Sequence, residues 1–165
     1  MLMLRLFRWP EIPLVAGGFV LNLGWEFAQS PLYADWGKEV SYLLWTRLHC
    51  TVGDVLILLG AYWLTTVLLL DRRWPTRPGF LGPALFVSAG LVYTVGSEWM
   101  NVSVRSAWQY RPEMPVVLGI GVSPILQWLV IPPLLVALLR RCLSSAALQR
   151  PRIAGRLHFR GRRET

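Results

Sequence analysis

Carboxyl groups stand inside three long apolar stretches of this 165-residue sequence, at Glu26, Asp54 and Glu98. An ionisable side chain within a membrane-spanning segment is costly, and by default it indicates a functional site. Carboxyl groups in such surroundings are the usual groups of acid–base catalysis. We therefore take Glu26, Asp54, Glu98 and the nearby His49 as the candidate catalytic residues.

Helical spacing places further polar residues on the same faces as these carboxyl groups. Asn22, Glu26 and Gln29 fall at positions i, i+4 and i+7, which form one face of a helix. In the third stretch, Asn101 shares the face of Glu98. Polar side chains on these faces, and indole rings near them, could contact a substrate. The candidate substrate-binding residues are Asn22, Trp25, Gln29, Trp99, Asn101, Arg105, Gln127 and Trp128.

Structural roles could also explain several of these residues. Asn22, Gln29 and Gln127 could form hydrogen bonds between helices, as amide side chains do in many membrane proteins. Glu98 and His49 could lie at the membrane surface, in contact with water. The sequence leaves both interpretations open.

Four apolar segments must position these side chains, at about 12–32, 49–70, 80–100 and 123–141. A helix needs about 20 mostly apolar residues to span a membrane. The sequence therefore predicts an all-α integral membrane protein, a four-transmembrane-helix bundle that forms one domain over residues 1–145. The aromatic residues of the segment 33–48 predict a further helix at the membrane surface. A cleaved signal peptide is the alternative for the first segment, but no A-x-A-like site follows it.

The start of the fourth segment has two interpretations. Ser123 and Pro124 are typical of a helix start, with a capping hydroxyl followed by proline in the first turn. Pro115, Gly119 and Gly121 favour a loop or a short re-entrant piece just before it. We expect the helix to begin at Ser123.

The basic residues predict the orientation in the membrane. Four of them, Lys38, Arg47, Arg105 and Arg111, flank one side, and the remaining thirteen of the 17 Lys and Arg residues flank the other side or lie in the tail 146–165. Short loops rich in Lys and Arg stay in the cytoplasm. We therefore expect both ends and the basic tail to be cytoplasmic, in a cell inner membrane that the chain crosses four times.

The depth of the carboxyl groups indicates a one-sided cavity. With a rise of about 1.5 Å per residue, Glu26, Asp54 and Glu98 lie roughly 21, 24 and 27 Å from the cytoplasmic ends of their helices. The other half of each helix is nearly all apolar, which favours a cavity near the outer surface over a continuous channel. The groups cannot all stay charged without compensation, which could come from a proton, Arg47, Arg105, protonated His49 or a metal ion. No HxxxH, ExxH or HExxH spacing occurs, so metal content and any cofactor stay unknown.

The expected partners follow from the same pattern. The net charge of +8 does not indicate a nucleic-acid partner, because the arginines lie beside apolar runs and in the tail. We expect membrane lipids and a lipophilic small-molecule substrate as partners, with a homo-oligomer or a membrane-complex partner left open. In residue type and layout the chain resembles membrane isomerases and cyclases that protonate double bonds in sterols or carotenoids, which implies acid–base chemistry. The alternatives are a non-catalytic accessory or assembly subunit and a proton- or cation-coupled transporter component.

Overall fold

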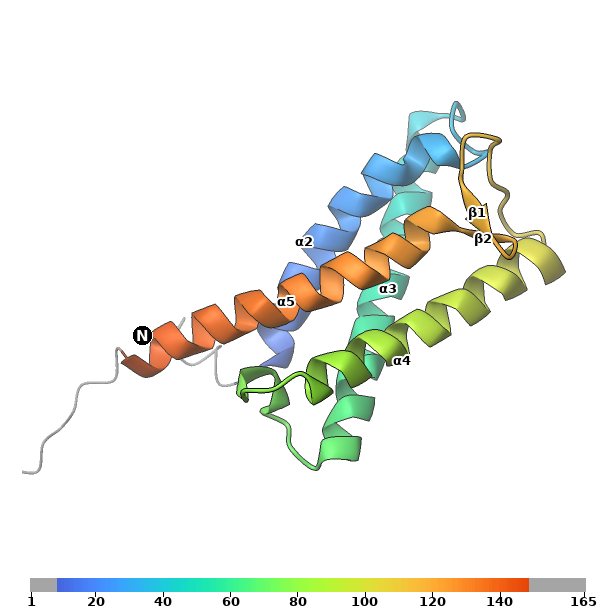
Figure 1. The fold of residues 1–165 in the computed structure, drawn as a ribbon. Coiled ribbons are helices and arrows are strands. Elements are labelled where there is room, and N and C mark those ends of the chain that lie inside the picture. The colour runs from blue at the N-terminus through green and yellow to red at the C-terminus, as the bar shows by residue number, and fades with distance from the viewer. Residues whose placement is uncertain (1–8, 149–165) are drawn as a thin grey trace, which may run out of the picture.

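Four α-helices make up most of residues 9–148, the part of the chain that the computed structural model describes (Figure 1). They are α2 (Glu11–Gln29), α3 (Val40–Leu69), α4 (Leu81–Glu98) and α5 (Val122–Leu148). Helix α2 packs against α3 and α5, and α4 packs against the same two helices. Each helix therefore contacts two others around a shared interior.

Shorter elements close the two ends of the bundle. One end carries 3₁₀ turns at Ser30–Leu32, a π-helical extension of α4 at Trp99–Val104, and an antiparallel hairpin of β1 (Val116–Val117) and β2 (Ile120–Gly121). We call it the hairpin end. The opposite end carries the turn between α3 and α4, with a 3₁₀ segment at Trp74–Thr76.

The structure confirms a mostly helical chain, and it bears on the membrane prediction in part. By length and composition, two of the described helices, α3 and α5, could cross a membrane. This finding supports membrane association. Four crossings, their direction and the inner membrane stay predictions.

The boundaries of the helices differ most from the expected ones in α3 and α5. The prediction of a separate surface helix over 33–48 is wrong, because α3 begins at Val40 and continues without a break into the apolar segment. No Pro or Gly occurs between Val40 and Val52 to interrupt the helical hydrogen bonds. Helix α5 begins at Val122, one residue before the expected start, and the preceding glycines form the hairpin instead of a re-entrant piece. Its backbone continues past residue 141 to Leu148, and the tail from residue 149 lies outside the described residues.

The apolar core fills the bundle from its middle to the end opposite the hairpin. Tyr62, Trp74 and Phe86 pack ring against ring there, and all three are buried. Tyr62 also donates a hydrogen bond to the backbone carbonyl of Arg72 in the turn. Trp128 of α5 caps this core toward the hairpin end. Between Trp128 and the hairpin end, apolar side chains do not fill the space between the helices.

Gly90 allows Trp128 to lie across α4, which gives the first testable prediction. A Cβ atom at residue 90 would lie 1.9 Å from Cζ3 of Trp128, and the indole is only 2% exposed. We expect Gly90→Ala to lower the free energy of unfolding by about 1–3 kcal/mol, the usual cost of overpacking. Thermal unfolding in detergent, followed by tryptophan fluorescence, measures this loss. Gly24→Ala is the matched control, because no atom lies within 4 Å of a Cβ there, and an equal loss in both variants would contradict the prediction.

Candidate functional site

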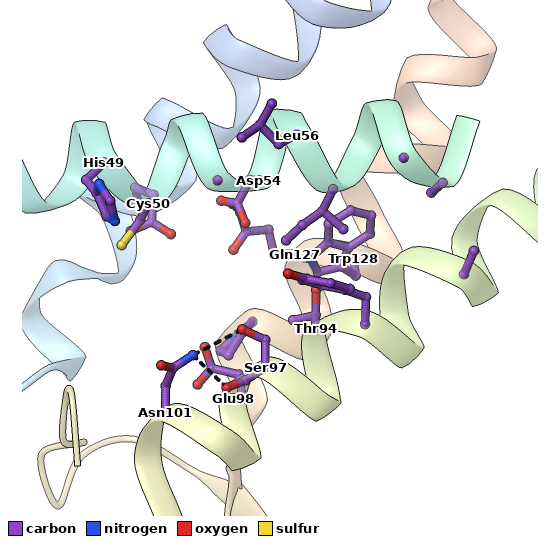
Figure 2. Close-up of a pocket in the computed structure, with 18 of the residues that line it drawn as sticks. His49, Cys50, Asp54, Leu56, Thr94, Ser97, Glu98, Asn101, Gln127 and Trp128 are labelled. Carbon is purple, nitrogen blue, oxygen red and sulfur yellow. Dashed lines mark hydrogen bonds between the residues drawn. The ribbon is translucent and has the colours of Figure 1, made fainter. Parts of the chain in front are cut away.

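A cavity of about 570 Å³ lies between α3 and α4, toward the hairpin end (Figure 2). We call it the lateral cavity. Figure 2 shows His49, Cys50 and Asp54 of α3 along one side, and Thr94, Ser97 and Glu98 of α4 along the other. Glu26 of α2 and Gln127 and Trp128 of α5 complete its lining. Its volume is in the range that holds one small-molecule ligand.

Apolar and small side chains form the rest of the wall. Leu56 and Leu64 of α3 and Tyr93 of α4 line the cavity and are themselves exposed on the outside of the bundle. Gly60 of α3 and Ala89 of α4 also line it, and their small side chains leave the space between the two helices unfilled. The cavity therefore opens between α3 and α4 on the side of the bundle, and its rim is apolar.

Glu26 is held by an amide and a guanidinium. Gln29 donates a hydrogen bond of 2.7 Å to its Oε1, and Nη1 of Arg47 lies 3.8 Å from its Oε2. Arg47 also binds Asp35 through Nη2. Ser123 of α5 donates to Oε1 of Gln29 and fixes the direction of that amide. Glu26 is only 5% exposed. Its carboxyl group therefore lies buried beside one cation, Arg47, which it shares with Asp35.

Asp54 and Glu98 have neutral partners only. Nε2 of Gln127 donates to Oδ2 of Asp54 at 2.8 Å. The hydroxyl of Tyr110 and the indole N–H of Trp108 donate to Oε2 of Glu98. Within residues 9–148, no Lys, Arg or His side chain forms an ion pair with either carboxyl group. Oδ1 of Asp54 and Oε1 of Glu98 accept no hydrogen bond from the described residues, so both oxygens are available to a ligand.

The loops at the hairpin end bring Tyr110 to Glu98. Tyr33 and Tyr110 form an isolated antiparallel bridge, and the backbone N–H of Ala34 donates to the carbonyl of Gln109. These bonds join the segment after α2 to the segment after α4. Burial, and then the bond to Glu98, raise the pKa of Tyr110 above its ordinary value. Tyr110 therefore stays a protonated hydrogen-bond donor at neutral pH.

The structure brings seven of the twelve predicted site residues to the lateral cavity. They are Glu26, His49, Asp54, Glu98, Asn101, Gln127 and Trp128. Three other predicted residues lie behind the wall of the lateral cavity, where they form hydrogen bonds. Asn22 accepts a hydrogen bond from Gln127, Gln29 binds Glu26, and Trp25 donates to Ser123.

Trp99 and Arg105 lie elsewhere, so their prediction as substrate-binding residues has no support in the geometry. Both side chains are exposed, and neither lines the lateral cavity. The reason is the π-helical segment Trp99–Val104, which changes the residues per turn after Glu98. Asn101 therefore lines the cavity with Glu98, whereas Arg105 does not.

Among the side chains that bind the three carboxyl groups, Arg47, Trp108 and Tyr110 are not among those predicted from the sequence. Arg47 is one of several cations that could balance a carboxylate, but nothing in the spacing places it beside Glu26. Trp108 and Tyr110 belong to a long loop whose path depends on contacts far along the chain. Their aromatic rings, between Arg105 and Arg111, are the one available signal.

A second cavity of about 440 Å³ adjoins the first at the hairpin end. We call it the loop chamber, because loop residues and the first turns of α3 line it. It shares four residues with the lateral cavity, and they form the boundary between the two: Glu26, His49, Cys50 and Trp108. The carboxyl group of Glu26 therefore borders both cavities.

A metal ion has no evident ligand set here. Over the described part of the chain, no group of three or more His, Cys, Asp and Glu side chains is arranged to hold one. Arg47 is placed to balance Glu26, whereas no cation among the described residues pairs with Asp54 or Glu98.

Comparison with known proteins gives no relative. No protein-family model, curated protein or solved structure matches the chain.

Removing Arg47 tests whether it stabilises the buried carboxylates. The side chains of Arg47 and Glu26 are 4% and 6% exposed, so Arg47→Met leaves Glu26 without its cation inside the bundle. We expect the free energy of unfolding to fall by about 3–5 kcal/mol, the cost of breaking a buried pair by removing one partner. Chemical unfolding in detergent measures it.

The control is Arg77→Met, which removes an ion pair with Asp71 from a side chain that is 68% exposed. We expect that change to cost about 1 kcal/mol or less. Adding Glu26→Gln to Arg47→Met should restore part of the lost stability, since it removes the uncompensated charge. The prediction is wrong if the two arginine variants lose equal stability.

Proposed function

We propose that the protein is a membrane-embedded enzyme that carries out acid–base chemistry on a lipophilic substrate. The observation that supports it most directly is the lateral cavity, in which carboxyl groups from α2, α3 and α4 share one space. The apolar rim between α3 and α4 suits a substrate that arrives from the lipid phase. Catalysis would then depend on the side chains that line the lateral cavity.

The hydrogen-bond partners suggest different roles for the carboxyl groups. Glu26 has Arg47 beside it and is the carboxylate best suited to accept a proton. Asp54 and Glu98 have only neutral partners and a free oxygen each, which suits a carboxylic acid that donates its proton to the substrate. Trp108 and Trp128 line the same cavity, and their rings can stabilise a cationic intermediate.

The same proposal includes four membrane crossings with both ends in the cytoplasm. Helices α2 and α4 bury Asn22, Glu26 and Glu98 and expose apolar side chains such as Val20 and Val92, which are 67% and 73% exposed. Polar inside and apolar outside is the pattern expected of helices that contact lipid. This pattern supports α2 and α4 as spanning helices beside α3 and α5.

A fusion test checks the topology. Green fluorescent protein fused after Thr165 should fluoresce, because it folds in the cytoplasm, and alkaline phosphatase fused after Trp36 should be active, because it needs the oxidising outer side. The opposite pattern would refute the proposed direction.

Two other functions are less well supported. A transporter needs a polar route through the bundle, but the apolar core around Tyr62 and Phe86 fills the end opposite the hairpin. An accessory protein that docks a partner is favoured by exposed Leu44 and Trp45 at the start of α3. That function would not require Glu26, which gives a direct way to separate it from an enzyme.

Deuterium transfer tests the enzymatic function in a way that does not depend on the identity of the substrate. Purified protein in D₂O is incubated with lipids extracted from the expressing cells, and carbon-bound deuterium is measured by mass spectrometry after back-exchange in H₂O. We expect one lipid class to gain deuterium with the wild-type protein, and Glu26→Gln to reduce the rate at least about 100-fold, the scale of general acid–base catalysis.

The matched control is Glu113→Gln, which removes an exposed carboxylate in the hairpin-end loop. It should leave the rate unchanged. Equal rates for Glu26→Gln and wild type, with both folded, would exclude the proposed role of Glu26.

A further inference from the structure

The loop chamber differs in chemistry from the lateral cavity that it adjoins. Hydroxyl, amide and indole groups line it, contributed by Tyr42, Trp45, Ser106 and Gln109. The rim residues Lys38 and Trp45 are exposed, so the chamber opens at the surface of the hairpin end. The lateral cavity carries its carboxyl groups on the inner wall, and it opens to the outside between the apolar side chains of Leu56, Leu64 and Tyr93. An elongated amphiphile matches a polar chamber that adjoins an apolar opening.

The charged side chains of the loop chamber already balance one another. Lys38 and Arg47 are its cations, and Glu26 and Asp35 are its carboxylates. Both Nη atoms of Arg47 are engaged with those two carboxylates. Nζ of Lys38 lies 4.3 Å from the ring centroid of Tyr42, on an exposed side chain.

This balance argues against a charged head group. Lys38 has an exposed side chain, where an ion pair with a phosphate or carboxylate head would contribute little. Deeper in the chamber, such a head would have to take Arg47 from Glu26 and Asp35, which would leave a buried carboxylate without its cation. An ammonium head would find no carboxylate in the chamber that lacks a partner. An uncharged oxygen, by contrast, needs only the hydroxyl, amide and indole groups that line the wall.

We propose that the ligand is a neutral amphiphile, with an uncharged oxygen-bearing head in the loop chamber and a hydrocarbon tail in the lateral cavity. This inference rests on the proposed function in taking the lateral cavity as the lipid site, and it adds the class of lipid. It places the chain of the ligand beside Glu26 where the two cavities meet. Alcohols and ketones with long unsaturated chains belong to this class.

Four ligands with one tail test the head group: farnesol, farnesyl phosphate, farnesylamine and the matching hydrocarbon 2,6,10-trimethyldodeca-2,6,10-triene, in which hydrogen replaces the hydroxyl group. Native mass spectrometry of the full-length protein in detergent counts the bound molecules and gives each Kd. We expect farnesol to bind at least about tenfold more tightly than the phosphate or the amine. Tighter or equal binding of either charged ligand overturns the proposal, as does a lack of binding by all four.

Two variants test whether the ligand occupies both cavities. Ala107 lines the loop chamber alone, and Gly60 lines the lateral cavity alone, where a Cβ would meet no atom within 4 Å. Ala107→Phe should weaken farnesol binding about tenfold and leave binding of the matching hydrocarbon unchanged. Gly60→Leu should weaken both ligands about tenfold. If Ala107→Phe leaves farnesol binding unchanged, the head does not lie in the loop chamber and the proposal is wrong.

Matched controls add the same side chains outside both cavities. Ala28→Phe and Gly24→Leu change exposed positions on α2 and should leave all four Kd values unchanged. The outcome is separate from the test of catalysis. Selective farnesol binding without deuterium transfer would refute the proposed enzyme and leave this inference in place, whereas deuterium transfer without head-group preference would do the reverse.

Discussion

Among the described residues, three carboxyl groups share the interior of a small apolar bundle with one guanidinium. Side chains at the hairpin end supply the donors that these carboxyl groups need. Arg47 is divided between Glu26 and Asp35. Asp54 and Glu98 receive amide, phenol and indole donors instead of cations. Uncompensated charge inside a protein is costly, so each of these donors contributes to stability as well as to the site. The polar groups that hold the bundle together are therefore the groups that shape its chemistry.

The fold separates this polar region from a conventional apolar core. Aromatic rings fill the end opposite the hairpin, and Trp128, seated on Gly90, forms the boundary between core and cavity. On the hairpin side of that boundary, the small residues Gly60 and Ala89 leave the space between α3 and α4 unfilled. A dense core at one end supplies the rigidity that lets the other end keep an open space. Such a space in the side of a bundle is accessible from lipid without a channel through the protein.

Glu26 has the most consequential position, because it borders both the lateral cavity and the loop chamber. In the proposed enzyme, a group in that position would exchange protons with the surface through the loop chamber while it contacts a substrate in the lateral cavity. Proton supply and substrate entry would then use different routes.

The sequence by itself determined the helical architecture and the helix faces on which Glu26, Asp54 and Glu98 lie, because apolar length and the 3.6-residue period are local properties. Tertiary structure alone decided that these faces share a cavity, and that Arg47 stands beside Glu26. It also decided that Tyr110 and Trp108 return from a loop to Glu98, whereas Trp99 and Arg105 turn away through a π-helical segment. Loop paths and local changes of helical period depend on contacts between segments far apart along the chain. Composition and spacing do not contain those contacts.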